Sequence, residues 1–250
     1  MQIIQITDLH IAELGSPTIL NIDVWGKFKR VLKEVKKLQP DLLVVSGDLC
    51  YNVENLSIYH WIKKELDQSG IPYQVIAGNH DNSGMIAQVF GLPLQEKTGE
   101  SYYSKQYDAG KILFLDSAKA VFSDNQWSWL KTELATEQPT MIFMHHPPAL
   151  AQTPFMDNHY SFKEMGKFAK VLETAQHGLQ KLRFLPIFCG HYHLEKYIQT
   201  DSFHVFITPS TMAQIDGSNP KYTISHLTPA YRTINWNGKQ VISGVTFLWD

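Results

Sequence analysis

Histidine, aspartate and asparagine, the residue types that bind metal ions, occur in five short clusters along the sequence. Imidazole nitrogen together with carboxylate oxygen suits zinc, iron or manganese. Two histidines at alternate positions of an extended segment, such as His191 and His193, project to the same side and can reach one metal centre. The clusters contain no cysteine, which argues against a structural zinc site. The clusters are Asp8-Leu9-His10, Gly47-Asp48, Gly78-Asn79-His80-Asp81, His145-His146-Pro147 and Gly190-His191-Tyr192-His193.

Each cluster taken alone also has a purely structural interpretation. Asp-x-His after a strand is commonly a capped turn, and Gly-Asp is a weaker signal still. Gly-Asn-His-Asp could be only a turn, because Gly and Asn tolerate left-handed backbone conformations. Five such clusters in one chain favour a common metal site over five unrelated turns.

Each cluster directly follows a short apolar segment, and these segments alternate with helical patterns. In an α/β sheet, ligands gather beyond the carboxyl ends of the strands, so the five clusters can meet at one edge. The alternation predicts a layered α/β fold. The predicted strands are residues 3–6, 42–45, 73–76, 112–115, 141–144, 185–188 and 204–207.

Helix signals lie between these strands. Apolar residues follow helical spacing over residues 25–38, and this helix should cover one face of a sheet. Ser123 with Gln126, and Ser161 with Glu164, have the spacing of capping boxes at the start of two further helices, of which the second is predicted to end near residue 178.

The C-terminal segment, residues 231–248, has β-branched runs on both sides of Asn237-Gly238, which predicts a hairpin. No internal repeat or linker divides the chain, so we expect residues 1–250 to form one domain.

Composition restricts the class of protein. The 250 residues are 44% hydrophobic and carry a net charge of −2, so no overall basic field would gather nucleic acid or an anionic membrane. The N-terminus lacks the features of a signal peptide and no apolar run approaches a membrane span, so we expect a cytoplasmic protein. Cys50 and Cys189 are too few for a disulfide framework, and we expect both to be buried as small apolar residues.

The order of the motifs resembles that of the calcineurin-like metallophosphoesterases: Asp-x-His, Gly-Asp, Gly-Asn-His-Asp, His-His-Pro-Pro and Gly-His-x-His, here from residue 8 to residue 193. Within this family, Ile-Thr-Asp-Leu-His, Phe-Met-His-His-Pro-Pro and Phe-Cys-Gly-His-Tyr-His are similar to the bacterial class III cyclic-nucleotide phosphodiesterases and the related glycerophosphodiesterases. Segments 208–211 and 229–232 are also similar to the cyclic-AMP members, although Ala230 stands where many relatives have glycine. The resemblance implies a four-layer α/β/β/α sandwich with mixed sheets.

The resemblance also implies two divalent or trivalent transition-metal ions, manganese, iron or zinc, bridged by Asp48. A hydroxide between ions roughly 3.5–4 Å apart would attack phosphorus in line, so Asp48 would take part in catalysis as well as in metal binding. The first ion would be held by Asp8, His10, Asp48 and His193, and the second by Asp48, Asn79, His145 and His191.

Four residues are predicted to act on the substrate side. Asn79 would bind its ion through a neutral amide oxygen, which adds no charge that repels the substrate. His80 would face the phosphate, where it could protonate the leaving oxygen or neutralise charge. His146 has three open roles: it could orient a ligand, contact substrate or pack at the edge of its cluster. His159 is expected to touch substrate from a lid made of residues 149–160 and 214–229.

We therefore expect a phosphodiesterase for a small diester, foremost a 3',5'-cyclic nucleotide. The alternatives are a glycerophosphodiesterase, a broad-specificity phosphodiesterase or phosphatase, and a non-catalytic scaffold of the same fold, which the complete ligand set disfavours. The acidic balance of charges also disfavours a nuclease, and we expect neither nucleic acid nor membrane as a partner. The resemblance and the apolar C-terminal hairpin leave a homodimer open.

Overall fold

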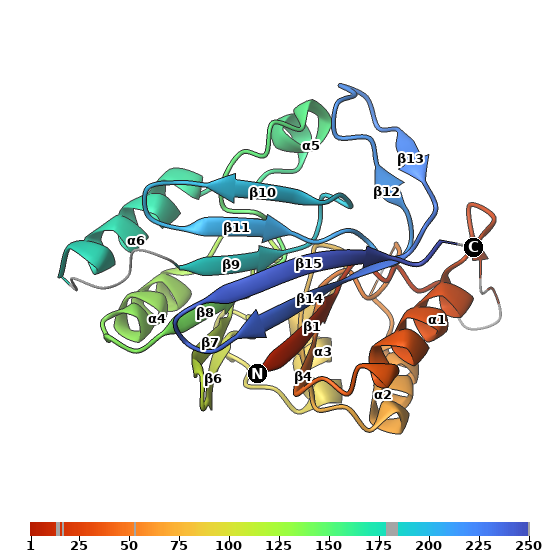
Figure 1. The fold of residues 1–250 in the computed structure, drawn as a ribbon, viewed down its shortest axis with the longest axis horizontal. Coiled ribbons are helices and arrows are strands. Elements are labelled where there is room, and N and C mark those ends of the chain that lie inside the picture. Colours follow the sequence, from red (N-terminus) through yellow and green to blue (C-terminus); the bar gives the residue numbers. More distant parts are fainter. Residues whose placement is uncertain (14–15, 17, 53, 179–184, 250) are drawn as a thin grey trace.

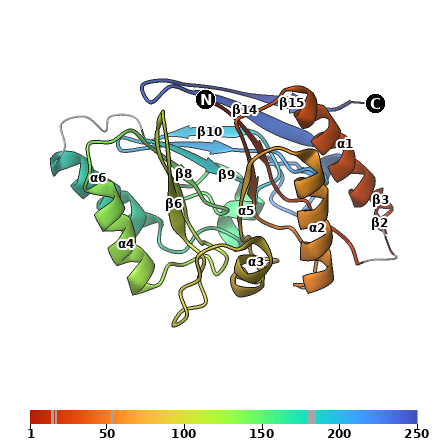
Figure 2. The same ribbon diagram turned by 90° about the horizontal axis from the view of Figure 1, so that it is seen from below.

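The computed structural model describes residues 1–13, 16, 18–52, 54–178 and 185–249 and contains two large mixed sheets packed face to face. Helices cover the outer side of each sheet (Figures 1 and 2). The strand order is β15-β14-β1-β4-β5 in the first sheet and β10-β11-β9-β8-β7-β6 in the second. The predicted four-layer α/β/β/α sandwich with mixed sheets is confirmed.

The first sheet has a parallel half and an antiparallel half. Its parallel strands are β1 (Gln2–Ile6), β4 (Leu42–Ser46) and β5 (Tyr73–Ile76), and its antiparallel strands are β14 (Ala230–Trp236) and β15 (Val241–Phe247). The last two form the predicted C-terminal hairpin. Helices α1 (Val24–Lys37), α2 (Leu56–Ser69) and α3 (Ser83–Phe90) cover its outer face.

The second sheet is parallel in the middle and antiparallel at both edges. Its strands are β6 (Tyr103–Tyr107), β7 (Gly110–Phe114), β8 (Thr140–Phe143), β9 (Pro186–Cys189), β10 (Lys196–Gln199) and β11 (His204–Ile207). Helices α4 (Asp124–Leu134) and α6 (Met165–Gly178) pack on its outer face. All seven segments predicted as strands are strands, with bounds that differ by at most one or two residues.

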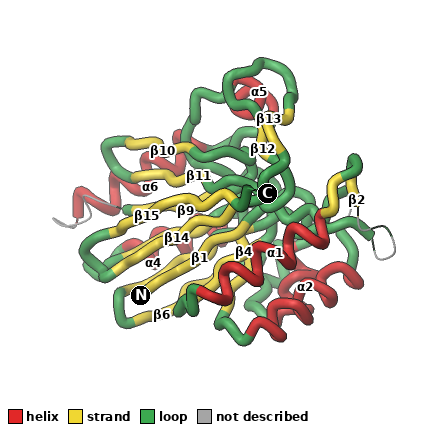
Figure 3. The backbone as a smooth tube through the Cα atoms, turned by 45° about the vertical axis from the view of Figure 1, so that its right-hand side comes forward, coloured by secondary structure: helices red, strands yellow, loops and turns green. Residues whose placement is uncertain are grey.

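Five short elements lie outside these layers. Helix α5 (Pro154–His159) and the hairpin of β12 (Gln214–Ile215) and β13 (Ile224–His226) lie side by side at one end of the molecule (Figure 3). Strands β2 (Thr18–Ile19) and β3 (Ile22–Asp23) form a small hairpin before α1.

Apolar residues fill both sides of the central strands. In β1, Ile3 faces the second sheet whereas Ile4 faces the helices, and Val44 and Val45 of β4 divide in the same way. Burial on both faces explains why these strands read as continuous apolar runs. Cys50 and Cys189 are buried free thiols, as predicted. None of the helices in the described segments has both the length and the apolar character needed to cross a membrane.

The two predicted capping boxes differ from what the structure contains. Ser123 does cap α4, because its side-chain hydroxyl accepts a hydrogen bond from the backbone N–H of Gln126. The Gln126 side chain, however, is buried against the backbone of Asp116, so this box has only one of its two bonds. The second box is wrong: α6 begins at Met165, and the Glu164 carboxylate accepts hydrogen bonds from Phe122 N and Trp127 Nε1 instead.

Phe188 lies in the core between the two sheets. Its ring is fully buried and stacks with Phe143 at 5.4 Å and with Phe206 at 4.8 Å between centroids. We expect Phe188→Ala to lower the free energy of unfolding by about 3–5 kcal/mol, measured by urea denaturation, because it leaves a cavity between the sheets. Ile242→Ala on β15, where the side chain is 69% exposed, should change it by less than about 0.5 kcal/mol. Equal losses in the two variants would contradict this account of the core.

Candidate metal centre

The five clusters meet at one edge of the sandwich. Three of them follow β1, β4 and β5 of the first sheet, and two follow β8 and β9 of the second. Backbone hydrogen bonds join the loops: Asp8 N donates to Gly47 O at 3.0 Å, and Gly190 N donates to His145 O at 3.1 Å. The predicted convergence of the clusters is therefore what the structure shows.

Asp8, His10, Asp48 and His193 form the first group, with ligand atoms that all lie within 4.8 Å of one another. His193 Nε2 lies 3.2 Å from Asp8 Oδ1 and 3.0 Å from His10 Nε2. His10 Nε2 is in turn 3.7 Å from Asp48 Oδ2. Two carboxylates and two imidazoles that point to one small volume form a donor set for a transition metal.

Asp48, His145 and His191 form the second group, and Asp48 therefore belongs to both. His145 Nε2 lies 3.2 Å from Asp48 Oδ2. Asn79, which follows β5, lines the cavity above this group together with Asp48 and His191. The resemblance implies these four side chains as ligands of the second ion, and that assignment stays a prediction.

Backbone carbonyls fix three of the four histidine rings. A carbonyl oxygen only accepts hydrogen bonds, so the ring nitrogen that contacts it must carry a proton, and in the neutral ring the other nitrogen has a free lone pair. A metal-binding histidine typically has such a second partner, which sets the orientation of its ring. The pairs are His145 Nδ1 with Ser46 O at 2.8 Å, His193 Nδ1 with Ala213 O at 3.0 Å, and His191 Nε2 with Tyr160 O at 2.8 Å.

The electrostatics of the two groups fit a bound cation. His145 Nε2 is buried without a hydrogen-bond partner among the described residues, and a metal ion would satisfy it. Burial raises the pKa of Asp8, but His193 and His145 outweigh it and hold that pKa at about 2. Burial acts to lower the pKa of His145, but Asp48 and Asp8 raise it to about 9. The carboxylates thus stay ionised and attract positive charge.

Several of these residues have an unusual backbone conformation. A positive φ costs a residue other than glycine roughly 1–2 kcal/mol, and such strain is typical of functional sites. Hydrogen bonds between the loops, such as His10 N to Asp48 O at 2.9 Å, hold this conformation in place. The φ angles are +54° for Asp8, +47° for His10, +51° for Asp48, +71° for His191 and +51° for His193.

Two glycines allow the loops to approach this closely. A Cβ at Gly190 would collide with Thr7 Oγ1 and Asp8 Oδ2, and a Cβ at Gly47, where φ is +101°, would collide with the His145 ring. Glycine is thus required beside Asp48 and beside His191 because ligand side chains occupy the space of a side chain there.

Asp81 is a residue of the site to which the sequence analysis assigns no role. Its carboxylate is buried, and burial together with the charge of Asp48 raises its pKa to about 7. The carboxylate ties the loop that carries Asp48 to the loop that carries Asn79. Its place as the fourth residue of Gly-Asn-His-Asp is the only signal in the sequence. Its donors are Leu49 N, Cys50 N, Gly78 N and Tyr59 OH.

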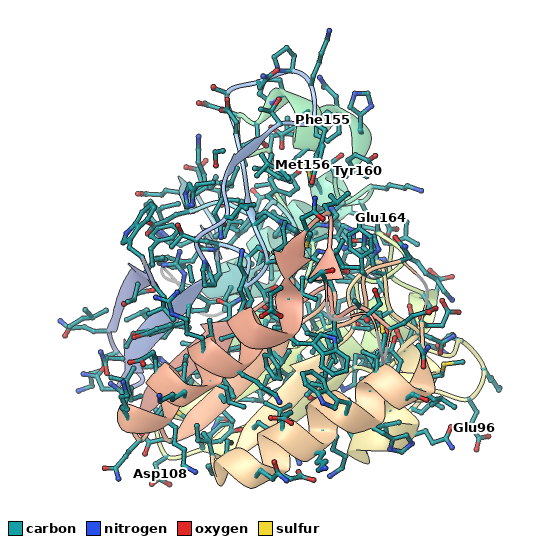
Figure 4. All side chains as sticks on the ribbon, turned by 90° about the vertical axis from the view of Figure 1, so that its right-hand side faces the viewer. Glu96, Asp108, Phe155, Met156, Tyr160 and Glu164 are labelled. Atoms are coloured by element: carbon teal, nitrogen blue, oxygen red, sulfur yellow. The ribbon has the colours of Figure 1, made fainter. Side chains whose placement is uncertain are left out.

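A cavity of about 390 Å³ opens directly above the two groups. His80 lines it, and the backbone N of His80 donates a hydrogen bond to Asp48 Oδ1 at 3.0 Å. The two predicted lid segments also line it: Phe155, Met156 and Tyr160 come from one segment, and Ile215 and Tyr222 from the other. Figure 4 shows Phe155, Met156 and Tyr160 together at the end of the molecule opposite Asp108.

His146 and His159 lie outside this cavity lining. His146 is buried, its ring packs against that of His191 at a tilt of 42° with 4.1 Å between centroids, and its Nδ1 lies 3.2 Å from Ser117 Oγ. Of its three predicted roles, this geometry favours orienting a ligand. His159 is exposed on α5 against Phe155, so its contact with substrate stays a prediction.

Comparison with known proteins gives a consistent family of relatives. The family model of the calcineurin-like phosphoesterases matches residues 1–195. A "probable cyclic nucleotide phosphodiesterase" of Fibrobacter succinogenes is 37% identical over 94% of this chain and 90% of its own length. The 3',5'-cyclic adenosine monophosphate phosphodiesterase CpdA of Escherichia coli is 26% identical over 94% of this chain and 84% of its own length.

Two further proteins are similar to this chain. The glycerophosphodiester phosphodiesterase GpdQ of Enterobacter lignolyticus is 27% identical over 90% of this chain and 84% of its own length. The crystal structure of a dimetal phosphatase from Danio rerio has the same fold, with a TM-score of 0.64 at 10% identity, and the match covers 97% of this chain and 98% of the other.

Asp48 is the single carboxylate common to both groups, so its removal should affect both ions. We expect the wild-type protein to bind two manganese or zinc ions per chain. Asp48→Asn should bind fewer than one, because the loss of the shared negative charge weakens each group. Elemental analysis after dialysis measures the ratio. Asp108→Asn, an exposed carboxylate far from the site, is the matched control and should bind two ions. Two ions in Asp48→Asn would show that another ligand joins them.

Proposed function

Because the chain belongs to the calcineurin-like phosphoesterase family, we propose that it hydrolyses a small phosphodiester, foremost a 3',5'-cyclic nucleotide, with two metal ions held by the groups that share Asp48. The observation that carries the proposal is a buried carboxylate common to two ligand groups at the floor of a cavity of about 390 Å³. The family membership confirms the prediction of a phosphoester hydrolase. A cytoplasmic location, a homodimer and a single domain stay predictions.

The runner-up substrate is a glycerophosphodiester, because one of the relatives that matches most of the chain is a glycerophosphodiester phosphodiesterase. The two candidates place the same phosphodiester group over the metal ligands. They differ in the group attached to it, which lies toward the lid.

The donor set indicates manganese, iron or zinc. Two such ions, when bound, draw charge from the phosphate and make water a nucleophile near neutral pH. The residues of the chain hold the reacting groups in place. The rings of His145 and His193 present Nε2 in fixed orientations, because their Nδ1 atoms donate hydrogen bonds to Ser46 O and Ala213 O. Asn79 would contribute an amide oxygen, which adds no negative charge beside an anionic substrate.

His80 is the candidate for proton transfer. Its backbone is fixed to the Asp48 carboxylate, its ring lies edge-to-face on His10 at 5.0 Å between centroids, and it lines the cavity. A ring nitrogen of His80 can therefore approach an oxygen of a phosphodiester in the cavity. When the bond between phosphorus and the 3' oxygen of a cyclic nucleotide breaks, that oxygen takes up one proton, and His80 would donate it.

The identity of the substrate is tested by comparing diesters. In the presence of manganese, zinc or iron, we expect cyclic AMP to be opened to the 5'-monophosphate with a larger kcat/KM than glycerophosphocholine or glycerophosphoethanolamine. Chelation should abolish both activities, and added metal should restore them. The reverse order of substrates would assign the chain to the glycerophosphodiesterases, and activity that survives complete metal removal would refute the role of the two groups.

The role of His80 is tested by changing the leaving group. Alkoxides are strongly basic and need a proton as they leave, whereas nitrophenolate does not. We expect His80→Ala to keep both metal ions and to lose roughly 10²- to 10⁴-fold in kcat on cyclic AMP, but much less on bis(4-nitrophenyl) phosphate.

The control for this experiment is the metal content of the variant. If His80 instead stabilises charge on the non-bridging phosphate oxygens, both substrates should slow by similar factors, because both present the same oxygens. Equal losses with two ions bound would therefore rule out His80 as the proton donor.

A further inference from the structure

The two ends of the cavity differ in chemistry. The floor consists of the candidate metal ligands, whereas Phe155, Tyr160 and Tyr222 from the two lid segments lie at the far end. Tyr51 also lines the cavity, with its ring 5.9 Å from that of His10. Phe155 touches two of the others, with ring centroids 5.8 Å from Tyr222 and 5.5 Å from Tyr160. Tyr222 is 53% exposed and Tyr160 is 49% exposed, so large ring surfaces remain open at the mouth of the cavity.

Both lid segments are attached to the loop that carries His191 and His193. In the second segment, Ile215 N donates to His193 O at 2.9 Å. The Asp157 carboxylate of α5 accepts hydrogen bonds from the Tyr192 hydroxyl at 3.0 Å and from Ala151 N and Thr153 N. His191 Nε2 donates to the carbonyl of Tyr160, the residue after α5. The aromatic end therefore has a fixed position relative to the floor, which is a requirement for recognising a substrate that spans both.

The charges of the described lining residues disfavour several kinds of substrate group at the far end of the cavity. None of the described residues that line the cavity is a lysine or an arginine, so they offer no cationic side chain to a second phosphate. Among the described lining residues the only carboxylate is that of Asp48, at the floor, so they offer no anionic partner to an ammonium group near the rings. A glycerol group has no flat face to match the rings. A neutral planar group fits best, because aromatic rings pair by offset stacking or edge-to-face contact.

We propose that Phe155 and Tyr222, with Tyr51 and Tyr160 beside them, form the surface on which the base of a nucleotide stacks while its phosphate lies on the metal ligands. This inference rests on the proposed function, and it assigns the recognition of the base to the lid. Asn52, which also lines the cavity, has an amide that can both donate to and accept from the edge of a base.

The first experiment removes either the base or the rings. Cyclic AMP is compared with its base-free analogue, in which hydrogen replaces adenine. The wild-type enzyme should prefer cyclic AMP by roughly 5- to 100-fold in kcat/KM, the range expected for stacking of one base. In Tyr222→Ala and Phe155→Leu, this preference should fall several-fold through a higher KM for cyclic AMP. Tyr222→Phe, which keeps the ring, should retain the preference for cyclic AMP.

The control is Tyr197→Ala, which removes an equally exposed tyrosine, 50% exposed, on β10 away from the cavity. It should keep the wild-type preference. Melting temperatures of all variants are compared, so that loss of the fold is not mistaken for loss of the base contact. An equal kcat/KM for the two substrates in the wild-type enzyme would overturn the inference, and so would a preference that survives in both Tyr222→Ala and Phe155→Leu.

A binding measurement separates this inference from the proposed function. Calorimetry on the metal-loaded enzyme compares AMP with ribose 5-phosphate, and AMP should bind more tightly in the wild type but not in Tyr222→Ala. If no cyclic nucleotide is hydrolysed but AMP still binds more tightly than ribose 5-phosphate, the proposed function fails, whereas the inference that these rings bind a base stands. If Tyr222→Ala loses activity on glycerophosphocholine but not on cyclic AMP, the rings bind an ammonium group and the inference is wrong.

Discussion

The structure of this site depends on the burial of two carboxylates, Asp8 and Asp48, side by side at the seam between two sheets. A buried negative charge is costly unless donors or cations surround it. No single loop can provide them, so the donors come from every loop at this edge. His191 N donates to Asp8, His80 N donates to Asp48, and the rings of His193 and His145 face the same two carboxylates. The convergence of the five motifs follows from this requirement.

The residues of the site come from both sheets of the sandwich. The first sheet supplies the carboxylates and Asn79, and the second supplies His145, His191 and His193. The relative position of the ligands is therefore set by how the sheets pack, which depends on rings such as Phe143 and Phe188 in the core between them. A rigid, close-packed core transmits small displacements to its surroundings. Core residues beneath the seam thus contribute to the relative positions of these side chains without touching them.

Much of this could be predicted from the sequence, because strand ends share an edge and because metal-binding residue types are rare enough to be recognised in clusters. The strands, α1 and the C-terminal hairpin follow from local patterns, whereas the lid segments contain no motif that predicts their structure. The remaining features depend on contacts between segments distant in the sequence. The role of Asp81, the positive φ of Asp8 and the carbonyl that accepts from each histidine exist only once the loops meet. Gln126 illustrates the same limit, because burial against Asp116 overrides its capping role.

The anchoring of α5 has a consequence for how such an enzyme can change over evolutionary time. The Asp157 carboxylate and the Tyr160 carbonyl attach this helix to the histidine loop, whereas the side chains of Phe155 and Tyr160 point to the cavity mouth. Attachment through a backbone carbonyl is independent of residue type, so Tyr160 can be exchanged while its bond to His191 is kept. Substrate preference can therefore drift by replacement of outward-facing rings while the hydrolytic machinery is inherited unchanged. A single scaffold of this kind can give rise to paralogues that share one chemistry and differ in the molecule they degrade.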